Sequence, residues 1–155
     1  MYNPSRLSVC LLVSIVLVSC ATPGLQVEEQ PAGNYKYDAW RLDSSGDYEA
    51  INVLLDEADR LIDKNELNAA ADKLERVLRI KPEYAPAWSR LSWVALQADS
   101  PNRSVQMAKR SNSFAYSDPE LQLLNWSFIR TASQMLNDDE TYRQADQKIN
   151  LLKSF

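Results

Sequence analysis

The sequence predicts an all-α protein whose folded part is a stack of about six antiparallel helices. Three observations carry this prediction. Apolar residues recur at intervals of three and four from about residue 47 onward, which is the spacing of helices with one buried face. Proline, asparagine or aspartate interrupts that spacing between consecutive segments. The character of the residues in the first segments also recurs 34 positions later, as in helical repeats.

Residues 1–19 have the pattern of a signal peptide. The apolar run from Leu7 to Val18 follows the basic residue Arg6 and is shorter than the roughly 20 residues of a membrane-spanning helix. The run ends in Leu17-Val18-Ser19-Cys20, which resembles the lipobox of bacterial lipoproteins. In such proteins the cysteine becomes the first mature residue and carries lipid, so we expect lipidation of Cys20. The alternatives are an ordinary secretory signal or an uncleaved signal anchor, and in both cases Cys20 carries no lipid.

The residue after Cys20 is Ala21. An aspartate there would resemble an inner-membrane retention signal, so the resemblance to sorted lipoproteins implies an outer-membrane, lipid-anchored protein that faces the periplasm. Residues 20–46 then predict a flexible linker, because Pro23-Gly24, the stretch 31–34 and the stretch 44–46 break any helical period. We expect no stable element before about Asp47.

Tyr35, Tyr37 and Trp40 make this linker unusually aromatic. They either fold back against the first helix or form a peptide-like docking segment, and the sequence leaves both interpretations open.

The composition argues against an enzyme. The chain contains no histidine, which removes the usual general base and the commonest zinc ligand. Its only cysteines are Cys10, inside the signal segment, and Cys20, so no thiol is left for a disulfide, redox or metal site. The mature chain has 16 basic and 21 acidic side chains, a net charge of −5, which disfavours nucleic acid. We therefore predict no catalytic residues, metal, cofactor or small-molecule substrate.

The first two helices of the domain, residues 47–155, are predicted between Asp47 and Lys81. Asn65 ends the first, because asparagine tolerates the left-handed conformation that follows many helices. The second ends before Lys81-Pro82, because proline disfavours helical geometry in the residue before it. The apolar residues at helical spacing are Ile51, Leu54, Leu55, Ala58, Leu61 and Ile62, then Ala69, Ala70, Leu74, Val77 and Leu78.

Four further helices follow. The third is predicted over Pro86–Ala98, and the fourth starts at Pro101, which suits a first helical turn, and ends near Asn112. The fifth starts at Pro119 with Asp118 as its cap and ends at Asn137-Asp138. The sixth, Thr141–Leu152, covers the open end of the stack, as the last element of a repeat array must.

Residues 34 apart match in the first four helices: Leu54 with Trp88, Ala58 with Ser92, Asn65 with Asp99, Ala70 with Ser104, and Leu74 with Ala108. The spacing of bulky, small, turn and proline positions resembles the tetratricopeptide repeat. The residues at its characteristic places are Leu54, Ala58, Leu61, Asn65, Leu67, Ala70, Leu74, Val77 and Pro82. The resemblance implies a tetratricopeptide-like helical repeat stack, and the alternative is a generic antiparallel bundle.

A narrower resemblance covers about residues 50–138. It rests on Leu74-Glu75-Arg76-Val77-Leu78-Arg79-Ile80-Lys81-Pro82, Trp88, Ala108-Lys109-Arg110-Ser111-Asn112, Leu121-Gln122, Asn125-Trp126 and Ile129. These strings resemble a family of small tetratricopeptide-repeat outer-membrane lipoproteins, the LpoP-like activators of class A penicillin-binding proteins. The resemblance implies a protein-interaction module that binds and activates a bifunctional peptidoglycan synthase. The alternative is a pilotin-like assembly lipoprotein for an outer-membrane secretin or another envelope complex.

Five residues are the candidates for partner binding in a groove: Arg90, Trp93, Leu123, Trp126 and Arg130. At 100° per residue the three apolar ones lie away from the core stripes of their helices, so they belong either to a second packing face or to a binding surface. Tryptophan is a frequent interface anchor, and the two arginines can bind a carboxylate beside it or be solvated surface residues.

Overall fold

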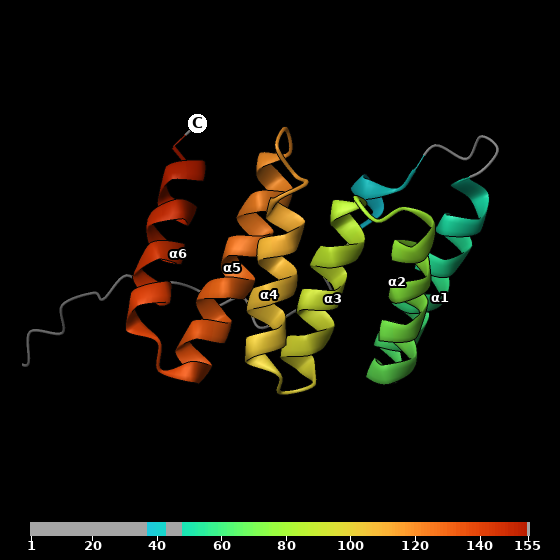
Figure 1. The fold of residues 1–155 in the computed structure, drawn as a ribbon, viewed down its shortest axis with the longest axis horizontal. Helices are drawn as coiled ribbons and strands as arrows, with labels where there is room; N and C mark the ends of the chain where they lie inside the picture. The colour runs from blue at the N-terminus through green and yellow to red at the C-terminus, as the bar shows by residue number, and fades with distance from the viewer. Residues whose placement is uncertain (1–36, 43–47, 155) are drawn as a thin grey trace, which may run out of the picture. The chain divides into compact units, whose positions relative to one another are not determined.

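The computed structural model describes residues 37–42 and 48–154, and it confirms the all-α class. Within these ranges there are six α-helices, one short 3-10 helix and no strand. Figure 1 shows the α-helices side by side in chain order, each antiparallel to the next. The elements are η1 (Tyr37–Trp40), α1 (Glu49–Asp63), α2 (Leu67–Ile80), α3 (Ala85–Gln97), α4 (Pro101–Asn112), α5 (Pro119–Leu136) and α6 (Asp139–Leu152).

Local sequence signals explain where the helices end. Asn65, Asp99 and Asn137 each adopt the left-handed conformation, with φ of 59°, 52° and 54°. Asparagine and aspartate tolerate this region better than other residues with a Cβ, so they stop a helix and reverse the chain. The carboxylate of Asp118 accepts a hydrogen bond from the Leu121 amide at 2.9 Å, which confirms its prediction as the cap of α5.

α6 begins two residues earlier than predicted. The carboxylate of Asp138 accepts a hydrogen bond from the amide of Thr141 at 3.0 Å, so Asp139 and Glu140 form the first turn. Hydrogen bonds from Thr141 hold the pKa of Asp138 below its ordinary value. The acidic cluster at 138–140 therefore acts as a helix start.

Small residues are completely buried where the helices cross. Ala58, Ala70, Ala108, Ala132 and Ala145 come from five different helices, and each lacks exposed surface. A methyl side chain lets two helix axes approach closely, which is why these positions are alanine. The larger buried side chains around them include Leu55, Leu74, Leu91, Phe128, Ile129 and Ile149.

Buried polar contacts join α3, α4 and α5. Ser92 of α3 and Ser104 of α4 share a hydrogen bond of 2.9 Å between their hydroxyls. The Ser111 hydroxyl donates to the Ala85 carbonyl at 2.8 Å and accepts from the Asn125 amide at 2.8 Å. Besides the contacts between consecutive α-helices, α3 packs directly on α5. The first helices of the second and third antiparallel pairs are therefore in contact.

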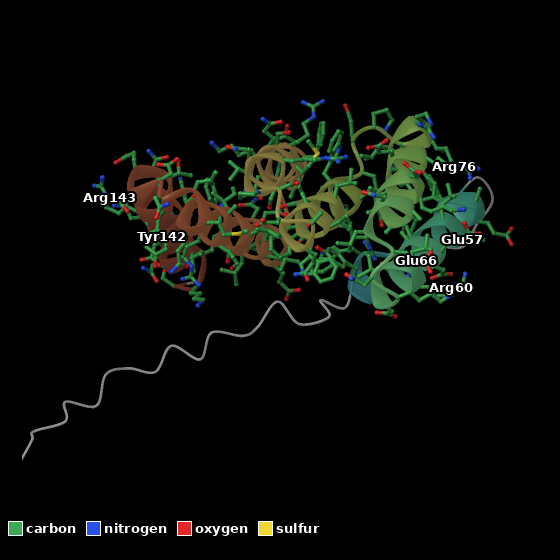
Figure 2. The ribbon with its side chains drawn as sticks, turned by 90° about the horizontal axis from the view of Figure 1, so that it is seen from below. Glu57, Arg60, Glu66, Arg76, Tyr142 and Arg143 are labelled. Carbon is green, nitrogen blue, oxygen red and sulfur yellow. The ribbon has the colours of Figure 1, made fainter. Side chains whose placement is uncertain are left out.

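The two ends of the array are charged. Figure 2 shows Glu57 and Arg76 at the end formed by α1 and α2, and Tyr142 and Arg143 on α6 at the other end. Glu57 pairs with Lys73 at 2.6 Å, and this hydrogen bond and charge lower the pKa of Glu57.

Within the described ranges, no helix is both long and apolar enough to span a bilayer.

The sequence prediction is wrong about one segment. We expected no stable element before Asp47, but residues 37–40 form a 3-10 helix that contacts the helical domain. The lipidation residue Cys20, the signal segment 1–19 and Tyr35 lie outside the described residues.

Candidate functional site

A short peptide segment lies across the first helices of the antiparallel pairs. We call residues Tyr37–Leu42 the strap. Its side chains and backbone contact α1, α3 and the residue before α5. Figure 1 shows η1, in blue, beside the start of α3. We call the residues that hold it the seat: Asn52, Asp56 and Asp59 on α1, Tyr84 before α3, Ser89 and Arg90 on α3, and Asp118 before α5.

Tyr37 binds the middle of α3. Its hydroxyl lies 3.1 Å from the Ser89 hydroxyl, and the Arg90 guanidinium lies 4.0 Å from the centre of its ring. Only 6% of Tyr37 is exposed. A guanidinium over an aromatic face is attracted to the electrons of the ring, so the ring covers the cation with favourable electrostatics.

Arg41 and Leu42 bind α1. The Arg41 guanidinium pairs with Asp56 at 2.7 Å and with Asp59 at 2.8 Å, and it also donates to the Asn52 carbonyl at 3.1 Å. The amide side chain of Asn52 pairs with both backbone groups of Leu42, at 3.3 and 2.9 Å. The backbone of the strap is thus held much as a bound peptide would be.

Trp40 connects the strap to the N-terminal ends of α3 and α5. Its indole N–H donates to the carboxylate of Asp118, and its carbonyl accepts from the Tyr84 hydroxyl. Its ring also lies 5.5 Å from the Tyr37 ring, tilted by 55°. Burial raises the pKa of the Tyr84 phenol above its ordinary value, so the hydroxyl keeps the proton that it donates.

Asp59 is shared between the strap and the helical core. One of its oxygens accepts from Arg90 Nε at 3.0 Å, and the other from Arg41 at 2.8 Å. The Arg90 side chain is 0% exposed, so a fully desolvated cation depends on this carboxylate. A buried charge of this kind needs a partner, and Asp59 supplies it from the neighbouring α1.

The five predicted groove residues occupy two separate environments. Arg90 is buried under the strap, and Trp93, one helical turn further along α3, is also buried. Leu123, Trp126 and Arg130 lie on α5 and are half-buried, and Arg130 pairs with Asp146 of α6 at 3.3 Å. Partner binding by all five stays a prediction, and only Leu123, Trp126 and Arg130 present accessible surface with the strap in place.

The seat contains residues that the sequence analysis did not select. The sequence analysis gave Asn52 and Asp59 no role, and it predicted Asp118 only as a cap. Their role depends on Arg41 and Trp40, which contact them across 11, 18 or 78 residues of chain. The aromatic enrichment at Tyr37 and Trp40 was the one available signal, and it left the binding surface open.

A separate apolar hollow of about 370 Å³ lies among α2, α3 and α4. Leu78, Trp88, Leu91 and Met107 line it, with charged residues at the rim. The described part of the chain contains no cluster of three or more acidic or cysteine side chains able to hold a metal ion. The residues of the seat contact aromatic, cationic and backbone groups of the strap.

Comparisons of the chain with protein-family models, with curated proteins and with solved structures found no match.

Proposed function

We propose that this chain is a non-enzymatic interaction module that binds and activates a bifunctional class A penicillin-binding protein in peptidoglycan synthesis. In this proposal Cys20 carries lipid, and the helical domain faces the periplasm from the outer membrane. One observation carries the interaction role: α1, α3 and the start of α5 together hold a six-residue peptide through its side chains and its backbone. The choice of partner rests on the sequence resemblance given above.

We also propose that α1 to α4 are two tetratricopeptide-like repeats. Pairs of residues 34 apart have equivalent roles. Ala58 and Ser92 are both completely buried, as are Ala70 and Ser104. Asn65 and Asp99 share the left-handed conformation at corresponding turns. Stacks of such repeats present a continuous surface to peptides or folded domains, which suits a binding role.

Binding alone does not activate an enzyme. The module must bind the active conformation of the synthase more tightly than the resting one, because a ligand shifts an equilibrium only by its differential affinity. The test is therefore twofold: recovery of the synthase, and an increased rate of glycan polymerisation when the purified module is added.

The first experiment is a pull-down with the soluble form, residues 21–155, against detergent-solubilised membranes. Trp126→Ala removes a half-buried aromatic on α5, and Tyr116→Ala, at an 81% exposed residue in the turn before α5, is the matched control. We expect recovery of a class A penicillin-binding protein that weakens with Trp126→Ala and persists with the control. Recovery of a secretin, or of no synthase, would contradict the proposal.

The membrane anchor has its own test. Palmitate labelling of the full-length chain should be lost in Cys20→Ala. Retained labelling would contradict lipidation at this residue, whatever the pull-down shows.

A further inference from the structure

We propose that the strap is a displaceable self-ligand, and that the seat beneath it binds a partner segment with an aromatic residue followed a few positions later by an arginine. This inference rests on the proposed function as an interaction module, and it specifies what the module recognises. The partner would replace the strap, so the free protein is self-occupied and the bound protein has its strap released.

The chemistry of the strap defines the chemistry of the ligand. The Tyr37 ring covers Arg90 and its hydroxyl meets Ser89, while Arg41 reaches the carboxylates of Asp56 and Asp59. Each contact uses a terminal side-chain group that another chain can supply. Asn52 recognises backbone amide and carbonyl groups, which every peptide has.

The negative charge of the seat favours a ligand with positive charge. The carboxylates of Asp56, Asp59 and Asp118 all face the strap, and the cation of Arg90 already pairs with Asp59. An arginine-bearing segment complements these carboxylates, whereas an acidic segment would be repelled. We therefore expect a basic and aromatic ligand.

The strap can leave without unfolding a helix. It lies outside all six α-helices, and its side-chain partners are 10 to 78 residues away in sequence. The Arg41 side chain is partly exposed, and the core leucines Leu55 and Leu74 are buried within the helices themselves. Segments held by a few peripheral contacts open at a lower free energy than the core does.

The strap also leaves two buried donors of α3 unsatisfied. Arg90 Nη1 and Trp93 Nε1 have no hydrogen-bond partner among the described protein groups. The Tyr37 ring covers the Arg90 guanidinium, and Trp93 lies about one helical turn further along α3. Leaving a buried donor unpaired is unfavourable. A partner segment that brings a backbone carbonyl within reach of these donors therefore has an advantage over the strap.

The experiment uses the full-length chain in detergent and a fluorescent synthetic peptide, Lys-Tyr-Asp-Ala-Trp-Arg-Leu, which copies residues 36–42. Binding is measured by fluorescence anisotropy to the wild type and to Tyr37→Ala/Arg41→Ala. A tethered segment competes at an effective concentration on the order of millimolar, so we expect the double variant to bind the peptide at least ~10-fold more tightly. Equal affinities, or binding to neither protein, would overturn the inference.

Seat variants in the double-variant background locate the binding. Asp59→Asn should weaken peptide binding by ~10-fold or more, and Asp146→Asn, which alters another arginine-paired carboxylate on α6, should not. If Asp59→Asn fails to fold by circular dichroism, Asp56→Asn replaces it, because that side chain is 57% exposed. Unchanged affinity in the folded seat variant, or equal binding of a peptide with glutamate in place of arginine, overturns the inference.

The outcome is separable from that of the pull-down. Peptide exchange without recovery of a synthase contradicts the proposed partner and leaves the seat intact. Recovery of a synthase without peptide exchange overturns only the self-ligand. If both hold, Tyr37→Ala/Arg41→Ala should also bind the synthase more tightly than the wild type.

Discussion

At the scale of single residues, Asp59 links the helical core to the strap. Its carboxylate binds the buried Arg90 and the partly exposed Arg41, so it has two roles of unequal weight. Removing the partner of a buried cation costs far more than removing an exposed ion pair.

We expect Asp59→Ala to lower the free energy of unfolding by about 3 kcal/mol, because it leaves Arg90 buried without a counter-charge. Arg41→Ala should lower it by less than about 1 kcal/mol, because Arg41 keeps contact with water. Urea unfolding of both variants measures the difference. Equal losses would show that Arg90 does not depend on Asp59.

Tyr84 should make the molecule sensitive to alkaline pH. Burial raises the pKa of its phenol above the ordinary value of 10. Because the folded pKa is the higher one, the stabilisation is complete below pH 10 and is lost as pH rises through the folded pKa. Ionisation also removes the proton that Tyr84 donates to the Trp40 carbonyl.

In wild type, the urea midpoint should therefore fall more steeply above pH 10 than in Tyr84→Phe, which lacks the titrating hydroxyl. The comparison is made by repeating the unfolding curves on both sides of that pH. Parallel pH profiles for the two proteins would count against this role of Tyr84.

At the scale of elements, the helix ends depend on residues that tolerate positive φ. Asn137 is left-handed between α5 and α6. We expect Asn137→Ala to lower the free energy of unfolding by about 1 kcal/mol, because alanine has a Cβ but lacks the short polar side chain with which asparagine tolerates this conformation. Asn137→Gly should retain or increase stability, since glycine has no Cβ. Thermal unfolding of the pair measures this, and identical effects would show that the turn does not constrain φ.

The six helices were predictable because their signals are local. Apolar spacing, the cap Asp118 and the turn residue Asn65 all act within a few positions of themselves. The strap was not predictable, because each of its contacts depends on a residue from a distant segment. Tyr37 and Ser89, for example, are 52 residues apart.

The surroundings of the predicted groove residues Arg90 and Trp93 were also not predictable from the sequence. Helical geometry placed Trp93 away from the core stripe of its helix, with Arg90 beside it, but it carried no information about what covers either residue. The partner of Arg90 is 31 residues earlier on α1, and Tyr37 lies over its guanidinium. A periodic pattern identifies the faces of one helix, but it does not predict which non-helical segment packs on them.

At the scale of the whole molecule, the α-helices share one continuous core in which each packs on its neighbours. Leu74 of α2 is completely buried, so Leu74→Ala should lower the free energy of unfolding by about 3 kcal/mol. Leu151→Ala, at an exposed residue of α6, should lower it by less than about 1 kcal/mol. Urea unfolding followed by circular dichroism compares them, and similar losses would contradict the role of Leu74 in the core.

The position of the strap links partner binding to the length of the membrane tether. In the lipid-anchored form proposed above, the membrane tether meets the domain at Tyr37 while the strap is seated, and at Tyr48 once a partner has displaced it. Residues 37–47 then pass to the tether. At about 3.3–3.6 Å per extended residue they lengthen it by at most ~40 Å. With a partner bound, the domain can therefore lie further from the membrane than it can while the strap is seated.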